Sequence, residues 1–183
     1  ETGKENTCNK RFDWKLGDLP HGYDHKYIYS NVGFNMKITD MQAACGLAQL
    51  NKLESFIKKR KKNHDFLFKK LSHLSDIISL PIAEKNSDPS WFGFYIILKK
   101  KSKINRRDLI KKLTEKNIGT RLIFAGNLTK QPAYINKNFK ISGKLENTND
   151  VMENAFWVGI HPALDEEELS YISKSLIEII KNS

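Results

Sequence analysis

Residues 39–75 constrain the fold most, because they form one long run with helical periodicity. Apolar side chains recur at three- and four-residue spacing, the spacing of one helix face, at Ala44, Leu47, Leu50, Leu53, Ile57, Leu67, Leu71 and Leu74. The run contains neither Gly nor Pro after Gly46, and Thr39 with Gln42 has the form of a capping box. The pattern predicts one helix of about 35 residues, or two joined without a break. That length favours a connector between domains or a dimer element.

Residues 76–183 change to a mixed pattern. Apolar runs predict strands at 76–82, 91–98, 120–124 and 156–160, with the turn signal SDPS between the first two. Helices are predicted to begin at the capping residues Asn105, Thr148 and Asp165, and to end near Gly119, Ala155 and Ile180. The fold class is therefore α+β, a small antiparallel sheet backed by helices. Trp14, Trp91 and Trp157 are interpreted as core residues.

A loop from Ala125 to Glu146 interrupts this pattern. Structureless loops of such length in compact domains are usually functional or disordered. Asn127 and Gln131 in this loop, and Arg121 just before it, are candidate polar ligands, since a guanidinium group can bind an anionic group through two hydrogen bonds. A surface ion pair is the alternative for Arg121, and a structural role is the alternative for His161, which precedes Pro162.

The net charge of +10 raises the question of nucleic-acid binding. The charge comes mostly from Lys, in runs such as 58–62 and 99–101, and no aromatic residues are interleaved with these runs to stack on bases. The composition therefore favours a solvated Lys-rich surface over a basic nucleic-acid-binding module.

Cysteine content and hydropathy bear on the compartment. Two cysteines build no disulfide framework, and no apolar run approaches the roughly 20 residues of a membrane span. The expected location is the cytoplasm, without a membrane partner. Cys45 among alanines on a helix is expected to be a small buried hydrophobe, whereas Cys8 lies in a polar segment. Since no Met stands first, Glu1 is expected to be a cut end.

Three segments together resemble the DegT/StrS-type sugar aminotransferases, which are fold type I enzymes using pyridoxal or pyridoxamine phosphate. The segment GFNMKITDMQAACGLAQL, residues 33–50, is similar to the Asn-centred signature of that family. The segments TRLIFAGNLTKQPAY, residues 120–134, and FWVGIHPAL, residues 156–164, resemble one branch, the CDP-4-keto-6-deoxyglucose 3-dehydrases. A further marker is NTCNKRF, residues 6–12. In that branch a Cys stands seven residues after a Cys-x-Cys pair and helps to hold a [2Fe–2S] cluster.

The resemblance implies a domain plan in which this chain is the C-terminal portion. Residues 1–38 are then the tail of a missing large domain and contain the cofactor-phosphate loop. Residues 39–75 are the connecting helix, and residues 76–183 form the small domain. The resemblance also implies roles for individual residues: Asn35 with Gly33 at the cofactor phosphate of a dimer partner, and Cys8 as a cluster ligand. Arg121, Asn127, Gln131 and His161 are implied at the substrate.

The implied activity is removal of the C3 hydroxyl from a nucleotide-linked keto-deoxysugar in lipopolysaccharide O-antigen biosynthesis. The implied partners are a second copy of the chain and an iron–sulfur flavin reductase that supplies electrons. The base expected in this branch is a His upstream of the chain, so the fragment alone is expected to be inactive and to hold neither cofactor. The alternative within the family is an ordinary nucleotide-sugar aminotransferase, which has a Lys at that upstream position.

Overall fold

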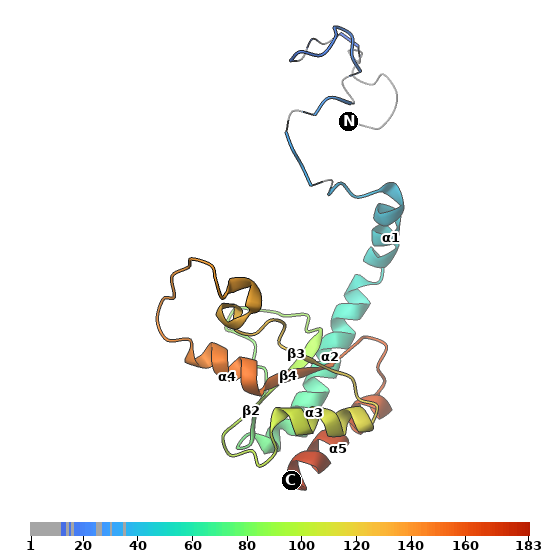
Figure 1. Ribbon diagram of the computed structural model, residues 1–183. Coiled ribbons are helices and arrows are strands. Elements are labelled where there is room, and N and C mark those ends of the chain that lie inside the picture. Colours follow the sequence, from blue (N-terminus) through green and yellow to red (C-terminus); the bar gives the residue numbers. More distant parts are fainter. Residues whose placement is uncertain (1–11, 14, 16, 25–26, 30, 35) are drawn as a thin grey trace. The chain divides into compact units, whose positions relative to one another are not determined.

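The computed structural model describes residues 12–183 except 14, 16, 25–26, 30 and 35. The described chain falls into two compact units, with the boundary after Leu47 (Figure 1). No helix among the described residues is both long enough and apolar enough to span a membrane.

The helical run predicted as unbroken is divided in two. Helix α1 (Asp40–Leu50) and helix α2 (Leu53–Leu71) are separated by a turn at residues 51–52, and a short 3₁₀ helix, η2 (Ser72–Leu74), follows α2. The break occurs at Asn51, a poor helix former, where the Lys52 N–H turns back to the Gln49 carbonyl at 2.9 Å. The unbroken connecting helix was therefore wrong in this detail.

Helix α1 begins as its capping signal predicts. The Thr39 N–H donates to Gln42 Oε1 at 2.9 Å, and the Gln42 N–H donates to Thr39 Oγ1 at 3.3 Å. No residue of α1 is buried, however. Cys45 is a free and exposed thiol, so the expectation that it is a buried hydrophobe was wrong.

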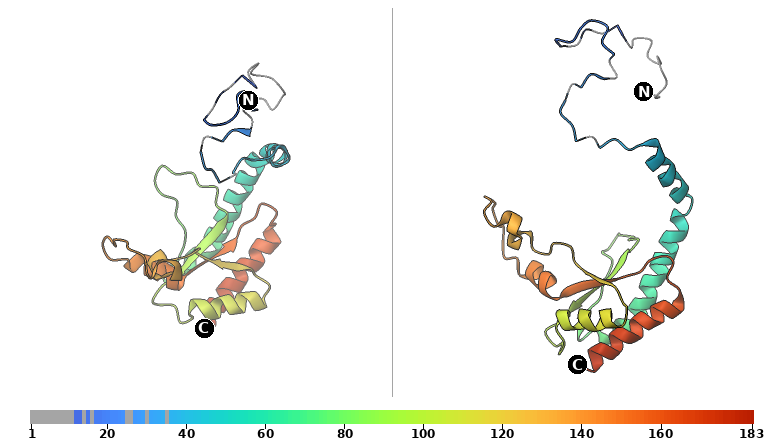
Figure 2. Two further views of the ribbon diagram at one scale, coloured as in Figure 1. Left: turned by 45° about the horizontal axis from the view of Figure 1, so that its top comes forward. Right: turned by 45° about the vertical axis from the view of Figure 1, so that its right-hand side comes forward.

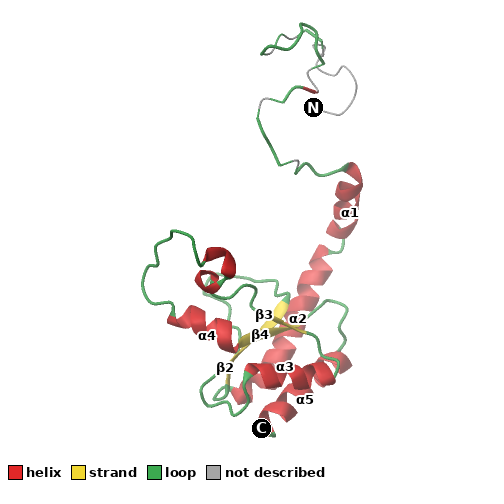
Figure 3. Ribbon diagram, in the orientation of Figure 1, coloured by secondary structure: helices red, strands yellow, loops and turns green. Residues whose placement is uncertain are grey.

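The second unit contains the predicted antiparallel sheet, in the order β1-β2-β4-β3. Figure 3 labels strands β2, β4 and β3 of this sheet, drawn in yellow. Three strands are shorter than the apolar runs that predicted them: β1 (Ile78–Ser79), β2 (Gly93–Leu98) and β3 (Thr120–Leu122). Strand β4 (Ala155–Gly159) has the predicted length but begins one residue earlier. β4 pairs with both β2 and β3, which leaves β1 and β3 as the edge strands.

One face of the sheet carries the core. Alternate side chains of β2 and β4 point inward and are fully buried. Phe94 pairs there with Val158, and Ile96 pairs with Phe156. Helices α2, α3 (Arg106–Glu115) and α5 (Glu166–Lys181) supply the facing apolar side chains, namely Leu67, Leu71, Leu109, Leu113, Leu169, Leu176, Ile179 and Ile180. Figure 2 shows the ribbons of these helices beside the sheet. The predicted apolar face of α5 is thus confirmed.

The helix ends are predicted only in part. Asn105 caps α3, and Asp165 with Glu168 forms a capping box at α5. Thr148 is not a cap, because α4 (Glu146–Asn154) already begins two residues before it, after Leu145. Helix α3 ends before Gly119, because Asn117 takes the left-handed conformation with φ of 58°.

Candidate functional site

The outer face of the sheet, opposite the core, places an arginine beside aromatic rings. The strand register pairs Trp157 of β4 with Tyr95 of β2 on one side and with Arg121 of β3 on the other. These three side chains belong to the alternation that points away from the helical layer. Trp157 lies outside the buried core cluster, which corrects its interpretation as a core residue.

Two further rings extend this row. Phe92 meets Trp157 edge-on with centroids 5.2 Å apart, and its centroid lies 6.3 Å from that of Phe124. The Trp157 indole lies directly over Gly93, where an added Cβ would come within 2.6 Å of the ring. Trp157 Nε1 donates to the Leu122 carbonyl at 3.1 Å, so the indole is fixed at both its face and its edge. We call Phe92, Tyr95, Phe124 and Trp157 the aromatic platform.

Phe124 adopts an unusual backbone conformation. Its φ is +44°, although it is neither Gly nor Asn, and its side chain is 73% exposed. A tight turn holds it there, in which the Phe124 N–H donates to the Leu122 carbonyl at 2.8 Å and the Gly126 N–H to the Ile123 carbonyl at 3.1 Å. Backbone strain of this kind costs about 1–3 kcal/mol and concentrates at functional sites.

Arg121 is available for an anionic ligand. It is exposed, and its Nη1 donates to the carbonyl of its neighbour Thr120 at 2.9 Å. No carboxylate of the described residues pairs with it, which disfavours the surface ion pair. Tyr95, a member of the aromatic platform, is partly buried, and this burial raises the pKa of its phenol.

The long loop after β3 is ordered by its own amides. Asn127 is 3% exposed; its Oδ1 accepts from the Thr129 N–H at 3.0 Å, and its Nδ2 donates to Asn149 Oδ1 at 2.8 Å. These contacts cap the 3₁₀ helix η3 (Leu128–Lys130) and tie the loop to α4. Gln131 donates from Nε2 to the Ala125 carbonyl at 2.8 Å, ahead of η4 (Pro132–Tyr134).

His161 lies at a different place. It lines an open hollow of about 660 Å³ between the end of α3, the end of β4 and α5. Its Nδ1 accepts from the Ala163 N–H at 3.1 Å, and its carbonyl accepts from Asn63 Nδ2 at 3.0 Å. The residues lining the hollow do not include Arg121, Asn127 or Gln131.

Two predicted cofactor ligands, Asn35 and Cys8, lie outside the described residues. Gly33 is exposed, and apart from its two chain neighbours no described residue has an atom within 4 Å of the position its Cβ would take. Within the described part of the chain, no group of three or more His, Cys, Asp or Glu side chains is placed to hold a metal ion.

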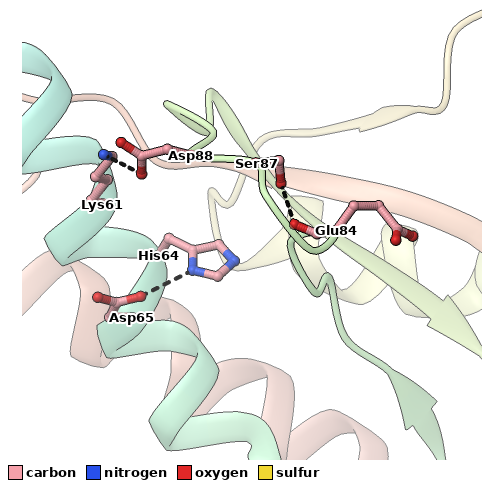
Figure 4. Close-up of polar contacts among 6 residues, drawn as sticks. All are labelled: Lys61, His64, Asp65, Glu84, Ser87 and Asp88. Atoms are coloured by element: carbon pink, nitrogen blue, oxygen red, sulfur yellow. Dashed lines mark hydrogen bonds and ion pairs between the residues drawn. The ribbon is translucent and has the colours of Figure 1, made fainter.

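A buried histidine on α2 escaped the sequence analysis. His64 stacks on Trp91 with centroids 4.7 Å apart and lies 5.4 Å from the Phe94 ring, while its Nδ1 lies 3.3 Å from Asp65 Oδ1. Figure 4 shows the turn at residues 84–88 beside it, where Asp88 pairs with Lys61 and Ser87 donates to the Glu84 carbonyl. Since nothing in the sequence pairs position 64 with Trp91, only the fold reveals this contact.

Three comparisons place the chain among known proteins. Residues 18–177 match the DegT/DnrJ/EryC1/StrS aminotransferase family. Lipopolysaccharide biosynthesis protein RfbH of Salmonella typhimurium is 53% identical over 170 residues, which are 93% of this chain and 39% of that protein. The dTDP-4-dehydro-2,6-dideoxy-D-glucose 3-dehydratase of Saccharopolyspora spinosa is 44% identical over all 183 residues, again 39% of that protein.

The fold is shared with solved structures. The E. coli GDP-4-keto-6-deoxy-D-mannose-3-dehydratase with bound hydrated PLP superposes with a TM-score of 0.74 at 27% identity, over 82% of this chain and 38% of that one. The predicted fold class, the small α+β domain of a PLP-dependent transferase, is thereby confirmed. The chain spans about two fifths of the length of these relatives. It belongs to the DegT/DnrJ/EryC1/StrS aminotransferase family.

Proposed function

We propose that this chain is the C-terminal part of a nucleotide-sugar 3-dehydrase of the CDP-4-keto-6-deoxyglucose type, in deoxysugar and lipopolysaccharide O-antigen biosynthesis. The observation that carries this proposal is the 44% identity, along the whole chain, to a protein named as a dTDP-sugar 3-dehydratase. Residues 1–38, 39–75 and 76–183 are then the large-domain tail, the connecting segment and the small domain. The enzyme is cytoplasmic, with no nucleic-acid or membrane partner.

The intact enzyme is proposed to use pyridoxamine phosphate and a [2Fe–2S] cluster. When bound, these groups supply the electron sink and the single electrons for loss of the C3 hydroxyl, with a flavin reductase as donor. Asn35 and Gly33 contribute hydrogen-bond donors to the cofactor phosphate, and Cys8 contributes one thiolate to the cluster. The fragment alone binds neither group stably and is inactive.

Substrate contacts are assigned to the second unit. Arg121 offers an exposed guanidinium that pairs with no carboxylate of the described residues, which suits the diphosphate. Gln131 and His161 contribute further polar atoms, and Asn127 also fixes the turn that carries Gln131.

A homodimer completes the proposed cofactor site. Large apolar side chains of the first unit, such as Phe34, Met36 and Met41, are exposed. Their exposure supports the proposal that this segment contacts the surface of a second copy of the chain. Small residues at Ala43, Ala44 and Gly46 of α1 permit close approach of another backbone.

A chimera tests this function. The whole of this chain replaces the matching segment of the Saccharopolyspora dehydratase, and loss of the C3 hydroxyl from dTDP-4-dehydro-2,6-dideoxy-D-glucose is measured with pyridoxamine phosphate and reductase. We expect turnover by the chimera and none by the chain alone. Asn35→Ala should weaken cofactor binding at least tenfold, whereas the matched amide variant Asn182→Ala should not. A folded, cofactor-loaded chimera without turnover would contradict the proposal.

The alternative activity is amination. A dTDP-4-amino-4,6-dideoxy-D-glucose transaminase of Shigella dysenteriae is 27% identical over 175 residues, so the family match alone does not separate the two reactions. The expected discriminator lies upstream of this chain, a His for the dehydrase and a Lys for the aminotransferase. Identification of that residue in the sequence preceding Glu1 therefore separates the two reactions, and a Lys there would favour the aminotransferase.

A further inference from the structure

We infer that the aromatic platform receives the apolar side of the deoxyhexose ring, including its C6 methyl group, while Arg121 binds the diphosphate attached to that sugar. This inference rests on the proposed function and deepens it, because it assigns the part of the substrate that each group recognises. It adds Phe124, Phe92 and Trp157 to the residues that determine specificity.

The platform is preorganised. Gly93 leaves space for the Trp157 indole, and the Leu122 carbonyl holds the indole N–H. The left-handed backbone of Phe124 projects an exposed ring beside Phe92, and the only ring contact described for Phe124 is with Phe92. Strain of this kind at a bulky residue is typical of a functional site.

The chemistry of the platform selects a deoxygenated sugar. The indole N–H of Trp157 is already used by the Leu122 carbonyl, and the exposed rings of Phe92 and Phe124 are apolar. A fully hydroxylated hexose that placed its C6 hydroxyl on such a surface would lose hydrogen bonds to water without replacement. A 6-deoxyhexose presents a methyl group instead, and transfer of that group from water to apolar surface is favourable.

The charge of the surrounding chain matches the rest of the ligand. From Lys116 to Leu145 the sequence contains no Asp or Glu, and its cations are Lys116, Arg121, Lys130, Lys137, Lys140 and Lys144. Arg121 is the strand neighbour of Trp157, so the apolar rings adjoin a cation that no described carboxylate pairs with. An anionic group joined to an apolar ring satisfies both features, and a diphosphate-linked deoxyhexose is such a molecule.

The test is a binding measurement on the 183-residue chain with two probes that differ only at C6. dTDP-6-deoxy-D-glucose and dTDP-D-glucose are titrated, and saturation transfer from protein aromatic protons to each ligand proton is recorded by NMR. We expect about tenfold tighter binding of the 6-deoxy probe, since one methyl group in an apolar site discriminates by roughly 10–200-fold. The strongest transfer should reach the C6 methyl protons.

Variants separate the two parts of the site. Phe124→Asn tolerates the left-handed backbone while removing the ring, and should abolish the preference between the probes; Phe124→Tyr should retain it. Arg121→Ala should weaken both probes equally. Phe139→Asn is the matched control, because Phe139 is an exposed ring of the same loop that pairs with Tyr134 instead.

Three results would overturn the inference: equal binding of both probes, transfer mainly to the thymine protons, or no binding at millimolar concentration. Each of them is distinguishable from failure of the proposed function, because turnover by the chimera does not depend on how this chain alone ranks the two probes.

Discussion

The two units of this chain use apolar residues in opposite ways. In residues 48–183, apolar side chains from three helices and the sheet meet in a core whose central members, such as Leu67 and Phe156, are fully buried. In residues 12–47, no described residue is buried, although Val32, Phe34, Met36 and Met41 are each more than three quarters exposed. The second unit therefore builds a buried core of its own, and the described part of the first unit does not.

This difference shows that periodicity reports an apolar face but not what covers it. Leu47 of α1 and Leu67 of α2 belong to the same predicted stripe, yet one is 67% exposed and the other is fully buried. An exposed apolar segment of this kind is typical of a surface that meets another protein surface. The comparison therefore makes predictions about stability for one unit and about association for the other.

The largest expected effect comes from truncating each leucine of the stripe. Leu67→Ala should lower the free energy of unfolding by about 2–5 kcal/mol, because it leaves a cavity in the core. Leu47→Ala should change it by less than about 0.5 kcal/mol, as for surface substitutions generally. Urea denaturation followed by circular dichroism measures both. Equal losses would show that α1 packs into the same cooperative unit.

Removal of the first unit should change association more than stability. A chain of residues 48–183 retains every member of the core cluster, so its urea midpoint should match that of the full chain. We expect the full chain to self-associate through its exposed apolar segment and the shortened chain to sediment as a monomer. A full chain that stays monomeric at high concentration would contradict the proposed dimer surface, and a lower midpoint would contradict the independence of the second unit.

The sequence predicts most of the second unit because local signals there agree with the packing. Asn105 and Asp165 supply side-chain acceptors at the start of α3 and α5, and both cap as expected. Alternation in β2 and β4 places Phe94 and Phe156 inward. Thr148 fails as a cap because α4 is already helical at Glu146, and Asn117 ends α3 before Gly119 can.

The candidate site is less predictable. Arg121 and the loop after it stand out in the sequence by residue type and length, and the structure leaves Arg121 exposed. The platform does not stand out, because it depends on the register of Tyr95, Trp157 and Arg121 across three strands. The conformation of Phe124 also has no sequence signal, since a turn of this kind normally selects Gly or Asn.

The two capping boxes allow a smaller test of the same contrast. Asp165→Ala removes the acceptor of the Glu168 N–H at the start of the buried helix α5, and should cost about 1 kcal/mol of global stability. Thr39→Ala removes the corresponding acceptor at α1, where no residue is buried, and should leave the global unfolding free energy unchanged. A loss of helical signal without a shift of the unfolding midpoint is expected for Thr39→Ala. A matching shift for both variants would mean that α1 unfolds together with the core.

The smallest expected effect concerns Tyr95. Partial burial raises the pKa of its phenol, because the charged phenolate is disfavoured away from water. The folded chain therefore holds this proton more tightly than the unfolded chain, so the resulting stability is present below the ordinary pKa of about 10 and is lost as pH rises through the folded value. Absorbance of tyrosinate should show a late component that Tyr95→Phe removes and that Tyr27→Phe, a change at an exposed ring in the first unit, leaves in place. If Tyr95→Phe removed an early component instead, the platform would be more open to water than the packing of Tyr95 beside Trp157 indicates.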